Sequence, residues 1–168
     1  MKYHKTELKI TSKVLGIALL LFVSMASNAQ QSHPEYARVQ LVIDNFFESI
    51  NTGNGELLAS LEVEGAQILN IREEIAGEYE FAARNWFVAE NFSSDTQLTE
   101  RYWDEELLIS DVLAVFWASY DFHIDGEFSH CGVDVLNLIK IEGEWKIGHA
   151  MWTIQQPGCE ASPLGPLN

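Results

Sequence analysis

Positively charged side chains are scarce in this 168-residue chain. It has 10 Lys and Arg residues against 25 Asp and Glu residues, and its formal net charge is −15 at pH 7. A surface this acidic repels phosphate backbones and anionic lipid headgroups. The composition therefore argues against nucleic-acid binding and against binding at a membrane surface.

Long hydrophobic runs are also missing, and the longest one, residues 14–23, lies near the amino terminus. A run of about ten residues spans roughly 15 Å as a helix, half the thickness of the hydrocarbon core. Lysines precede the run and Ser27-Asn28-Ala29 follows it, which is typical of a signal peptide cut after Ala29. We therefore predict a signal peptide over residues 1–29 and a periplasmic or secreted protein. A membrane anchor is the alternative.

Cleavage would remove four lysines and one glutamate, so the formal charge of the remaining chain becomes −18. No cysteine lies near the cut, which argues against a lipoprotein anchor. We expect no membrane contact after cleavage. No internal repeat or long linker divides the chain, so residues 30–156 are predicted to form one domain. An extended tail over residues 157–168 follows it.

Metal and cofactor motifs are absent from the sequence. It has no Asp-x-Asp-x-Asp-Gly calcium loop, no His-x-x-x-His pair and no Cys-x-x-Cys pair. We predict no metal and no cofactor. The alternative is a mixed nitrogen–oxygen metal site built from Asp121, His130 and either Asp134 or His149.

Only two cysteines are present, Cys131 and Cys159. An even count in an oxidising compartment favours a disulfide, and this one would pin the tail to the sheet. Against it, Cys131 is expected to pair across its strand with a residue near Ile154. The tail would then have to turn back after Pro157-Gly158. The sequence leaves the bridged and the free state open.

Helical periodicity is confined to the first half of the mature chain. Residues 32–35 resemble a capping box, and apolar side chains then recur at helical spacing up to residue 50, before Gly53. Asn54-Gly55 begins a short second helix. Residues 79–90 are predicted to form a third helix that buries Phe81.

Apolar and polar residues alternate in the second half of the chain, as expected for strands. Strands are predicted over residues 66–71, 101–108, 112–124, 128–141 and 145–154. Asp125-Gly126 and Glu142-Gly143 favour two-residue type I′ hairpins. Helices followed by an antiparallel meander indicate an α+β fold, with the helices packed on one side of a curved sheet.

The hairpin at Asp125-Gly126 provides the candidate site. An uninterrupted register across this turn places Asp121 directly opposite His130. Opposed residues have Cβ atoms roughly 5 Å apart, within reach of a side-chain hydrogen bond. We predict His130 as a general acid or base and Asp121 as the group that orients it.

The same register, continued through the second hairpin, predicts a ligand pocket on that face. The predicted pocket residues are Trp117, Ser119, Asp134, His149 and Met151. Burial among apolar side chains would raise the pKa of a carboxyl group, an arrangement suited to proton abstraction beside a carbonyl. Tyr120 is predicted on the opposite, outer face. A register slip of one residue would reverse this assignment.

The closing strands resemble those of the nuclear transport factor 2-like superfamily, which includes the SnoaL-like polyketide cyclases and ketosteroid isomerase. The most specific stretches are residues 116–134 and 138–147, and the similarity covers most of the mature chain. The resemblance implies a cone-shaped α+β half-barrel, with the helices on the concave face and a pocket between helices and sheet. It also implies homodimers packed through the outer sheet face.

The superfamily hosts isomerases, dehydratases, cyclases, hydrolases and modules without catalysis, so the fold does not settle the function. Our interpretation is an exported domain that binds a small, partly apolar ligand, with isomerase-, lyase- or hydrolase-type acid–base chemistry. The alternative is a non-catalytic binding or dimerisation module, in which Asp121 and His130 form only a structural cross-strand pair. The sequence leaves open whether the chain is an enzyme.

Overall fold

Two helices precede the sheet in the computed structural model, which describes residues 32–75, 77–85, 96–156 and 158–167. Helix α2, Tyr36–Asn51, ends before Gly53, whose φ of 63° is the left-handed conformation that stops a helix. Helix α3, Gly55–Leu61, is capped by Asn54, whose side chain accepts a hydrogen bond from the Leu57 amide at 3.0 Å. Both helices lie close to their predicted limits.

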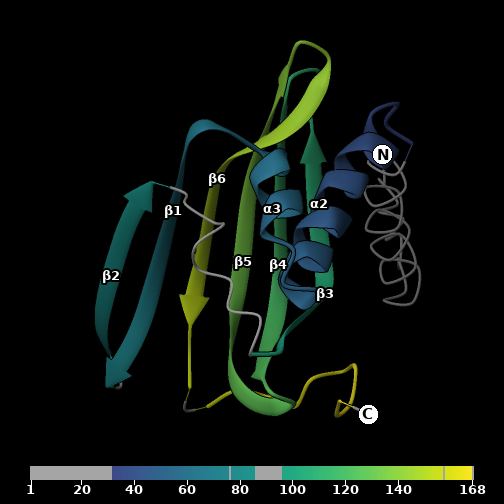
Figure 1. The fold of residues 1–168 in the computed structure, drawn as a ribbon. Coiled ribbons are helices and arrows are strands. Elements are labelled where there is room, and N and C mark those ends of the chain that lie inside the picture. Colours follow the sequence, from purple (N-terminus) through teal and green to yellow (C-terminus); the bar gives the residue numbers. More distant parts are fainter. Residues whose placement is uncertain (1–31, 76, 86–95, 157, 168) are drawn as a thin grey trace, which may run out of the picture. The chain divides into compact units, whose positions relative to one another are not determined.

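Six strands form one curved sheet, and both helices pack on the same face of it (Figure 1). The strands are β1 Glu62–Ile75, β2 Glu78–Asn85, β3 Leu98–Ile109, β4 Leu113–Ile124, β5 Glu127–Ile141 and β6 Glu144–Ile154. Their order across the sheet is β2-β1-β6-β5-β4-β3. The predicted α+β fold with helices on one face is confirmed. The sheet is antiparallel except where β1 runs parallel to β6.

Both predicted hairpin turns are confirmed. Asp125 and Gly126 have φ values of 52° and 83°, and Glu142 and Gly143 have 52° and 86°. Positive φ at both central residues is the mark of a type I′ turn, which matches the right-handed twist of the flanking strands. These two turns align β4 with β5 and β5 with β6.

The prediction of a third helix is wrong where the structure describes it. Residues 79–85 lie in strand β2, which pairs antiparallel with β1, and Phe81 is 70% exposed rather than buried. Strand β1 leaves one edge open beside β6, and pairing with that edge outweighs the local helical pattern. Residues 86–90 of the predicted helix lie outside the described residues.

The predicted capping box is also wrong. The residue that caps α2 is Glu35, and its side chain bonds to no backbone amide of the first turn. Its carboxylate instead accepts hydrogen bonds from Trp145 Nε1 at 2.8 Å and from Lys140 Nζ at 2.9 Å. The start of α2 is therefore fixed to the β5–β6 hairpin by tertiary contacts.

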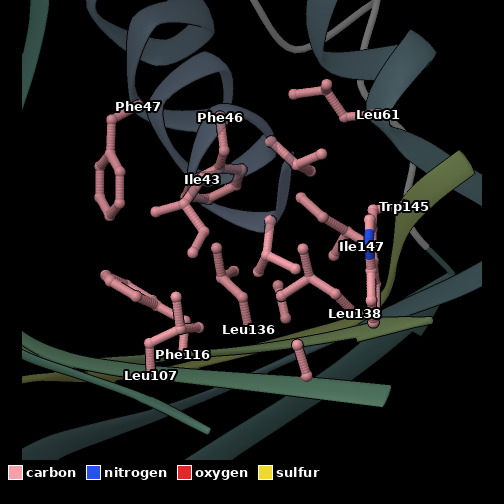
Figure 2. Close-up of a cluster of buried hydrophobic side chains, with 14 of the residues drawn as sticks. Ile43, Phe46, Phe47, Leu61, Leu107, Phe116, Leu136, Leu138, Trp145 and Ile147 are labelled. Atoms are coloured by element: carbon pink, nitrogen blue, oxygen red, sulfur yellow. The ribbon is translucent and has the colours of Figure 1, made fainter. Parts of the chain in front are cut away.

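The main core lies between α2 and the helix-side face of the sheet (Figure 2). The Phe47 ring contacts Tyr102 and Phe116, with ring centroids 4.4 Å and 5.9 Å away. Trp145 is 4% exposed and belongs to this core. These contacts define which side chains of each strand point toward the helices, and hence which groups can meet there.

Tyr120 lies on this helix-side face, so its predicted position on the outer face is wrong. Its ring crosses over Gly132 of β5, and its hydroxyl donates a hydrogen bond to the Thr153 carbonyl of β6 at 2.7 Å. A Cβ atom at position 132 would lie 2.0 Å from that carbonyl oxygen and 2.7 Å from Tyr120 Cε1. The Tyr120 ring can lie here only because Gly132 has no side chain.

We predict that Gly132→Ala lowers the free energy of unfolding by about 3 kcal/mol, the upper end of overpacking costs. The clash is with a backbone oxygen, which cannot rotate away. Gly148→Ala is the matched control, because its nearest contact would be an ordinary 3.7 Å from Ile139. Urea unfolding of both variants measures the difference, and equal losses would contradict the explanation.

Candidate functional site

A β-bulge in β5 changes the partners of the predicted catalytic residues. Ser129 is the extra residue, so His130 lies opposite Phe122 and Asp121 lies opposite Cys131. Side chains alternate between the two faces along a strand, and one extra residue reverses the faces that follow it. His130 is therefore on the helix-side face and Asp121 on the outer face. The predicted pair of Asp121 and His130 is wrong, and we do not retain it.

A second bulge, in β6, separates the predicted pocket residues. Asn137 lies opposite His149, whereas Leu138 lies opposite Ile147, which leaves Gly148 as the extra residue. Of the predicted pocket residues, only Asp134 lies on the helix-side face with His130. The others lie on the outer face: Trp117, Ser119, His149 and Met151.

Asp121 has a different partner on the outer face. Arg101 of β3 donates to both of its carboxylate oxygens, from Nε at 2.9 Å and from the terminal nitrogen at 2.5 Å. A two-point pair of this kind fixes the position of the carboxylate. Asp121 is therefore held by Arg101 on the outer face, away from His130.

The helix-side face carries a pair of buried carboxyl groups, Glu100 of β3 and Asp134 of β5. They are 7% and 4% exposed, and the Asp134 carboxyl raises the pKa of Glu100 both through its negative charge and through a side-chain hydrogen bond. Because two ionised carboxylates have no proton between them, this bond requires that one of the two be protonated. One of the predicted pocket residues, Asp134, thus lies in an acid–base pair with a residue that the sequence analysis did not select.

The environment assigns different roles to the two carboxyls. Burial raises the pKa of both, because the charged form loses its hydration. The negative charge and the hydrogen bond of Asp134 raise the pKa of Glu100 further, whereas the same bond acts to lower that of Asp134. Glu100 therefore keeps its proton to a higher pH than Asp134, whose pKa rises to about 7, so within the pair Glu100 is the proton donor and Asp134 the acceptor.

One oxygen of the pair receives no hydrogen bond from outside the pair. Asp134 Oδ2 is fully buried, and no N–H or hydroxyl group of the described residues donates to it. An unsatisfied buried carboxylate oxygen costs free energy, so its presence needs an explanation. Trp152 of β6 lies directly opposite Asp134, and Ala118 of β4 lies opposite on the other side. Asp134 is therefore flanked across the sheet by the aromatic Trp152 on one side and by the small Ala118 on the other.

His130 is a neutral imidazole in this setting. Burial lowers its pKa to about 4, and the positive charge of Arg72 on β1 lowers it as well. Its ring stacks on Phe122 with centroids 4.9 Å apart, and its Nδ1 is 3.0 Å from Ser129 Oγ. His130 can therefore accept or donate a hydrogen bond on the helix-side face without carrying charge.

The sequence held a signal for Glu100. Tyr102 follows it two positions later on the same strand face and is packed against the core. Had Tyr102 been assigned to the core, the alternation of β3 would have placed the Glu100 carboxyl on the same side. Arg72 gave no such signal, because its place depends on how β1 pairs with β6.

No family model and no curated protein sequence matches this chain. Among solved structures, a "putative dehydratase from the NTF2-like family" of Streptomyces avermitilis superposes with a TM-score of 0.56 at 12% identity, covering 71% of this chain and 95% of that one. A "putative scytalone dehydratase" of Novosphingobium aromaticivorans DSM 12444 has a TM-score of 0.53 at 10% identity, covering 80% and 93%.

A third similar structure is described as an association domain rather than as a dehydratase. It is a "putative Ca/calmodulin-dependent kinase II association domain" of Exiguobacterium sibiricum 255-15, with a TM-score of 0.57 at 13% identity, covering 75% of this chain and 97% of that one. This chain has the nuclear transport factor 2-like fold. At such identities the likeness concerns the fold alone.

In this nuclear transport factor 2-like domain, the carboxyl pair lies on the face that the helices cover. Among the described residues, no group of three or more His, Cys, Asp or Glu side chains is arranged to hold a metal ion. None of the described helices is long and apolar enough to cross a membrane.

We predict that Glu100→Gln makes stability less sensitive to pH. Between the pKa of an unfolded glutamate, about 4.3, and the raised value in the folded chain, the unfolded state binds fewer protons than the folded state. The free energy of unfolding therefore falls as the pH rises through this window, by about 1 kcal/mol per pH unit. Glutamine cannot ionise, so this fall should become shallower between pH 5 and pH 8.

Urea unfolding at several pH values measures the slope. Glu106→Gln, an exposed position on the same strand, is the control. Equal slopes for the wild type and Glu100→Gln would show that Glu100 ionises normally in the folded protein.

Proposed function

We propose that this chain binds a small, partly apolar molecule on the helix-side face and transfers a proton with the Glu100–Asp134 pair. The observation that carries the proposal is the buried Asp134 Oδ2 atom, to which no N–H or hydroxyl group of the described residues donates, beside a carboxyl that keeps its proton. A ligand C–H or O–H group directed at this oxygen would satisfy it.

The chemistry follows from the two protonation states. Asp134 takes a proton from a carbon beside a carbonyl, and its raised pKa makes it a stronger base than an exposed aspartate. Protonated Glu100 keeps its hydrogen bond to Asp134, and neutral His130 supplies a polar contact as negative charge develops on the ligand oxygen. Proton removal of this kind serves both isomerases and dehydratases.

The surroundings of the pair favour an apolar ligand. Trp152 and Phe122 lie on the same face as Asp134 and His130. Two of the similar structures are described as dehydratases, which supports a lyase-type reaction. We therefore propose a carbonyl compound with an apolar ring or chain as the substrate class.

We predict that the protein catalyses hydrogen–deuterium exchange beside a carbonyl. Cyclohexanone, 2-cyclohexenone and 4-hydroxy-2-butanone in D₂O serve as probes, and NMR follows loss of the proton signal. Asp134→Asn should slow exchange about 100-fold or more, the usual contribution of a general base. His149→Gln, on the outer face, should leave it unchanged. No exchange above the buffer rate with any probe would contradict a catalytic role.

A second candidate function, a non-catalytic dimerisation module, is favoured by the outer sheet face. Its apolar side chains include Phe81, Leu108 and Trp117, which are 70%, 60% and 39% exposed. Large exposed apolar surfaces mark interaction sites. One similar structure is described as an association domain. We propose a homodimer through this face, which is compatible with either function of the helix-side face.

We predict that Trp117→Lys converts the dimer to a monomer, because a charge would be buried in the interface. Sedimentation at about 50 μM measures the mass. Leu41→Lys is the control, since Leu41 is 58% exposed on α2 rather than on the sheet. A wild-type protein that sediments as a monomer would contradict the proposed interface.

We also propose that the protein is exported. A disulfide joins Cys131 and Cys159, with Cα atoms 6.0 Å apart, and such bonds persist in oxidising compartments. The bridged state that the sequence left open is thus the one present. The predicted signal peptide lies outside the described residues. Mass spectrometry of the protein from its native host should find Gln30 as the first residue.

A further inference from the structure

Helix α2 ends on the backbone of Glu100. The Asn51 side chain donates from Nδ2 to the Glu100 carbonyl at 3.0 Å and accepts the Glu100 amide at 2.7 Å. Strand β3 is at the edge of the sheet, so these two backbone groups face away from β4. The side-chain amide of Asn51 thus forms the two hydrogen bonds that the backbone of a neighbouring strand would form with Glu100.

The start of β3 is tied down at the same point. Gln97 Nε2 donates to the Asn51 carbonyl at 3.0 Å, and the Gln97 amide donates to the Asp125 carboxylate at 2.9 Å. Three segments therefore meet here: the end of α2, the start of β3 and the β4–β5 turn. An edge strand without such contacts frays and admits water.

We propose that Asn51 is a positioning residue, which holds Glu100 against Asp134 and keeps water from the shared proton. This inference rests on the proposed function only for its catalytic meaning. Loss of the Asn51 side chain frees the β3 edge, hydrates Glu100 and brings its pKa down toward the ordinary value. The measurable consequence is a change in the pH at which the pair releases its proton.

The test is infrared spectroscopy of the full chain in D₂O, which separates a protonated carboxyl band from the amide bands. Glu100→Gln assigns the band by removing it. In Asn51→Ala, the midpoint at which the band disappears should fall by about one pH unit or more. Thr52→Ala is the matched control, because it removes a hydrogen bond at the same helix end, from Thr52 Oγ1 to the Glu48 carbonyl at 2.6 Å.

Asn51→Asp supplies a second variant. It keeps the acceptor for the Glu100 amide and adds a negative charge nearby, so the midpoint should stay or rise. A midpoint that is unchanged in Asn51→Ala, or that moves equally in Thr52→Ala, would overturn the positioning role. A wild type that shows no protonated carboxyl at pH 8 would instead overturn the proposed function.

An independent observation concerns the outer face of the sheet around Asp121. Asp121 and His123 have side chains only 4% and 8% exposed, although they lie on the sheet face opposite the helices. His123 Nδ1 is buried, 3.7 Å from Asp121 Oδ1, and has no hydrogen-bond partner among the described residues. Trp117, on the same face of the same strand, is 39% exposed. One end of this face is buried and the other is open, and the Phe128 ring, with its centroid 5.7 Å from that of His123, covers His123 on one side.

The carboxyl-terminal tail starts next to this covered end. Cys131 lies directly opposite Asp121 and is bonded to Cys159, and it also pairs with Gln155 through backbone hydrogen bonds of 3.0 Å and 2.9 Å. The disulfide therefore places the tail one strand spacing from the Asp121 carboxylate, on the outer face. Past Cys159, the tail folds into a turn, closed by the Gly165 amide on the Ser162 carbonyl at 3.1 Å.

We infer that the tail is a disulfide-held cover over Arg101, Asp121 and His123, which reduction releases. A dithiol supplies two electrons and two protons, leaves two cysteine thiols and becomes a disulfide itself. The released tail uncovers the ion pair and lengthens the open outer face. The redox state of one bond would thereby control how much of this face a partner can reach.

Modification by diethyl pyrocarbonate, read by mass spectrometry, tests the cover. His123 should react at least 10-fold faster after reduction with dithiothreitol, and His149, elsewhere on the outer face, should not change. Cys159→Ser gives the same comparison if the native bond resists reduction. Faster reaction at both histidines would indicate unfolding and overturn the cover, and so would an unchanged His123 rate in Cys159→Ser.

Discussion

The hydrogen bond between the carboxyls of Glu100 and Asp134 requires a proton that neither side chain keeps in water at neutral pH. The fold supplies it by withholding hydration from both groups at once. Two buried carboxylates without that proton would repel each other in a medium of low dielectric constant. Strand β3 supplies Glu100, and α2 packs on the face that buries it, so both elements help to keep this shared proton in place.

Small residues make room for the pair. Ala118 lies in the row of Asp134, and Gly132 allows the Tyr120 ring to cross β5 and donate its hydroxyl to Thr153. Burial raises the pKa of Tyr120, so this hydroxyl keeps its proton. Because its hydroxyl already donates to a backbone carbonyl, Tyr120 limits the space on this face but does not donate a proton to a ligand. The chemistry of the face is thereby left to the carboxyls and His130.

Local rules of the chain predicted the elements but not the partners of the site. The type I′ turns, the break at Gly53 and the Asn54 cap depend on a few adjacent residues, and all were predictable. The predicted pairing of Asp121 with His130 depended on an uninterrupted register of the two strands from the turn at Asp125-Gly126. The extra Ser129 reverses that count, and its own sequence carries no mark of a bulge such as a glycine.

The remaining misses are non-local for a related reason. Residues 79–85 have a helical pattern, yet the open edge of β1 recruits them as a strand. Glu100 meets Asp134 across β4, so no spacing along the chain brings them together. The Cys131–Cys159 bridge was predictable as a candidate but required the turn of the tail to close. The contact of Glu100 with Asp134 and the bridge of Cys131 to Cys159 each join segments far apart in sequence.

The two faces of the sheet meet opposite physical demands. The helix-side face buries ionisable groups and compensates them with a shared proton, whereas the outer face compensates Asp121 with the full charge of Arg101. A proton can be given to a ligand and recovered, but an ion pair held by two hydrogen bonds cannot exchange partners without a large cost. The proposed proton transfer therefore fits the helix-side face, and the proposed subunit contact and tail cover fit the outer face.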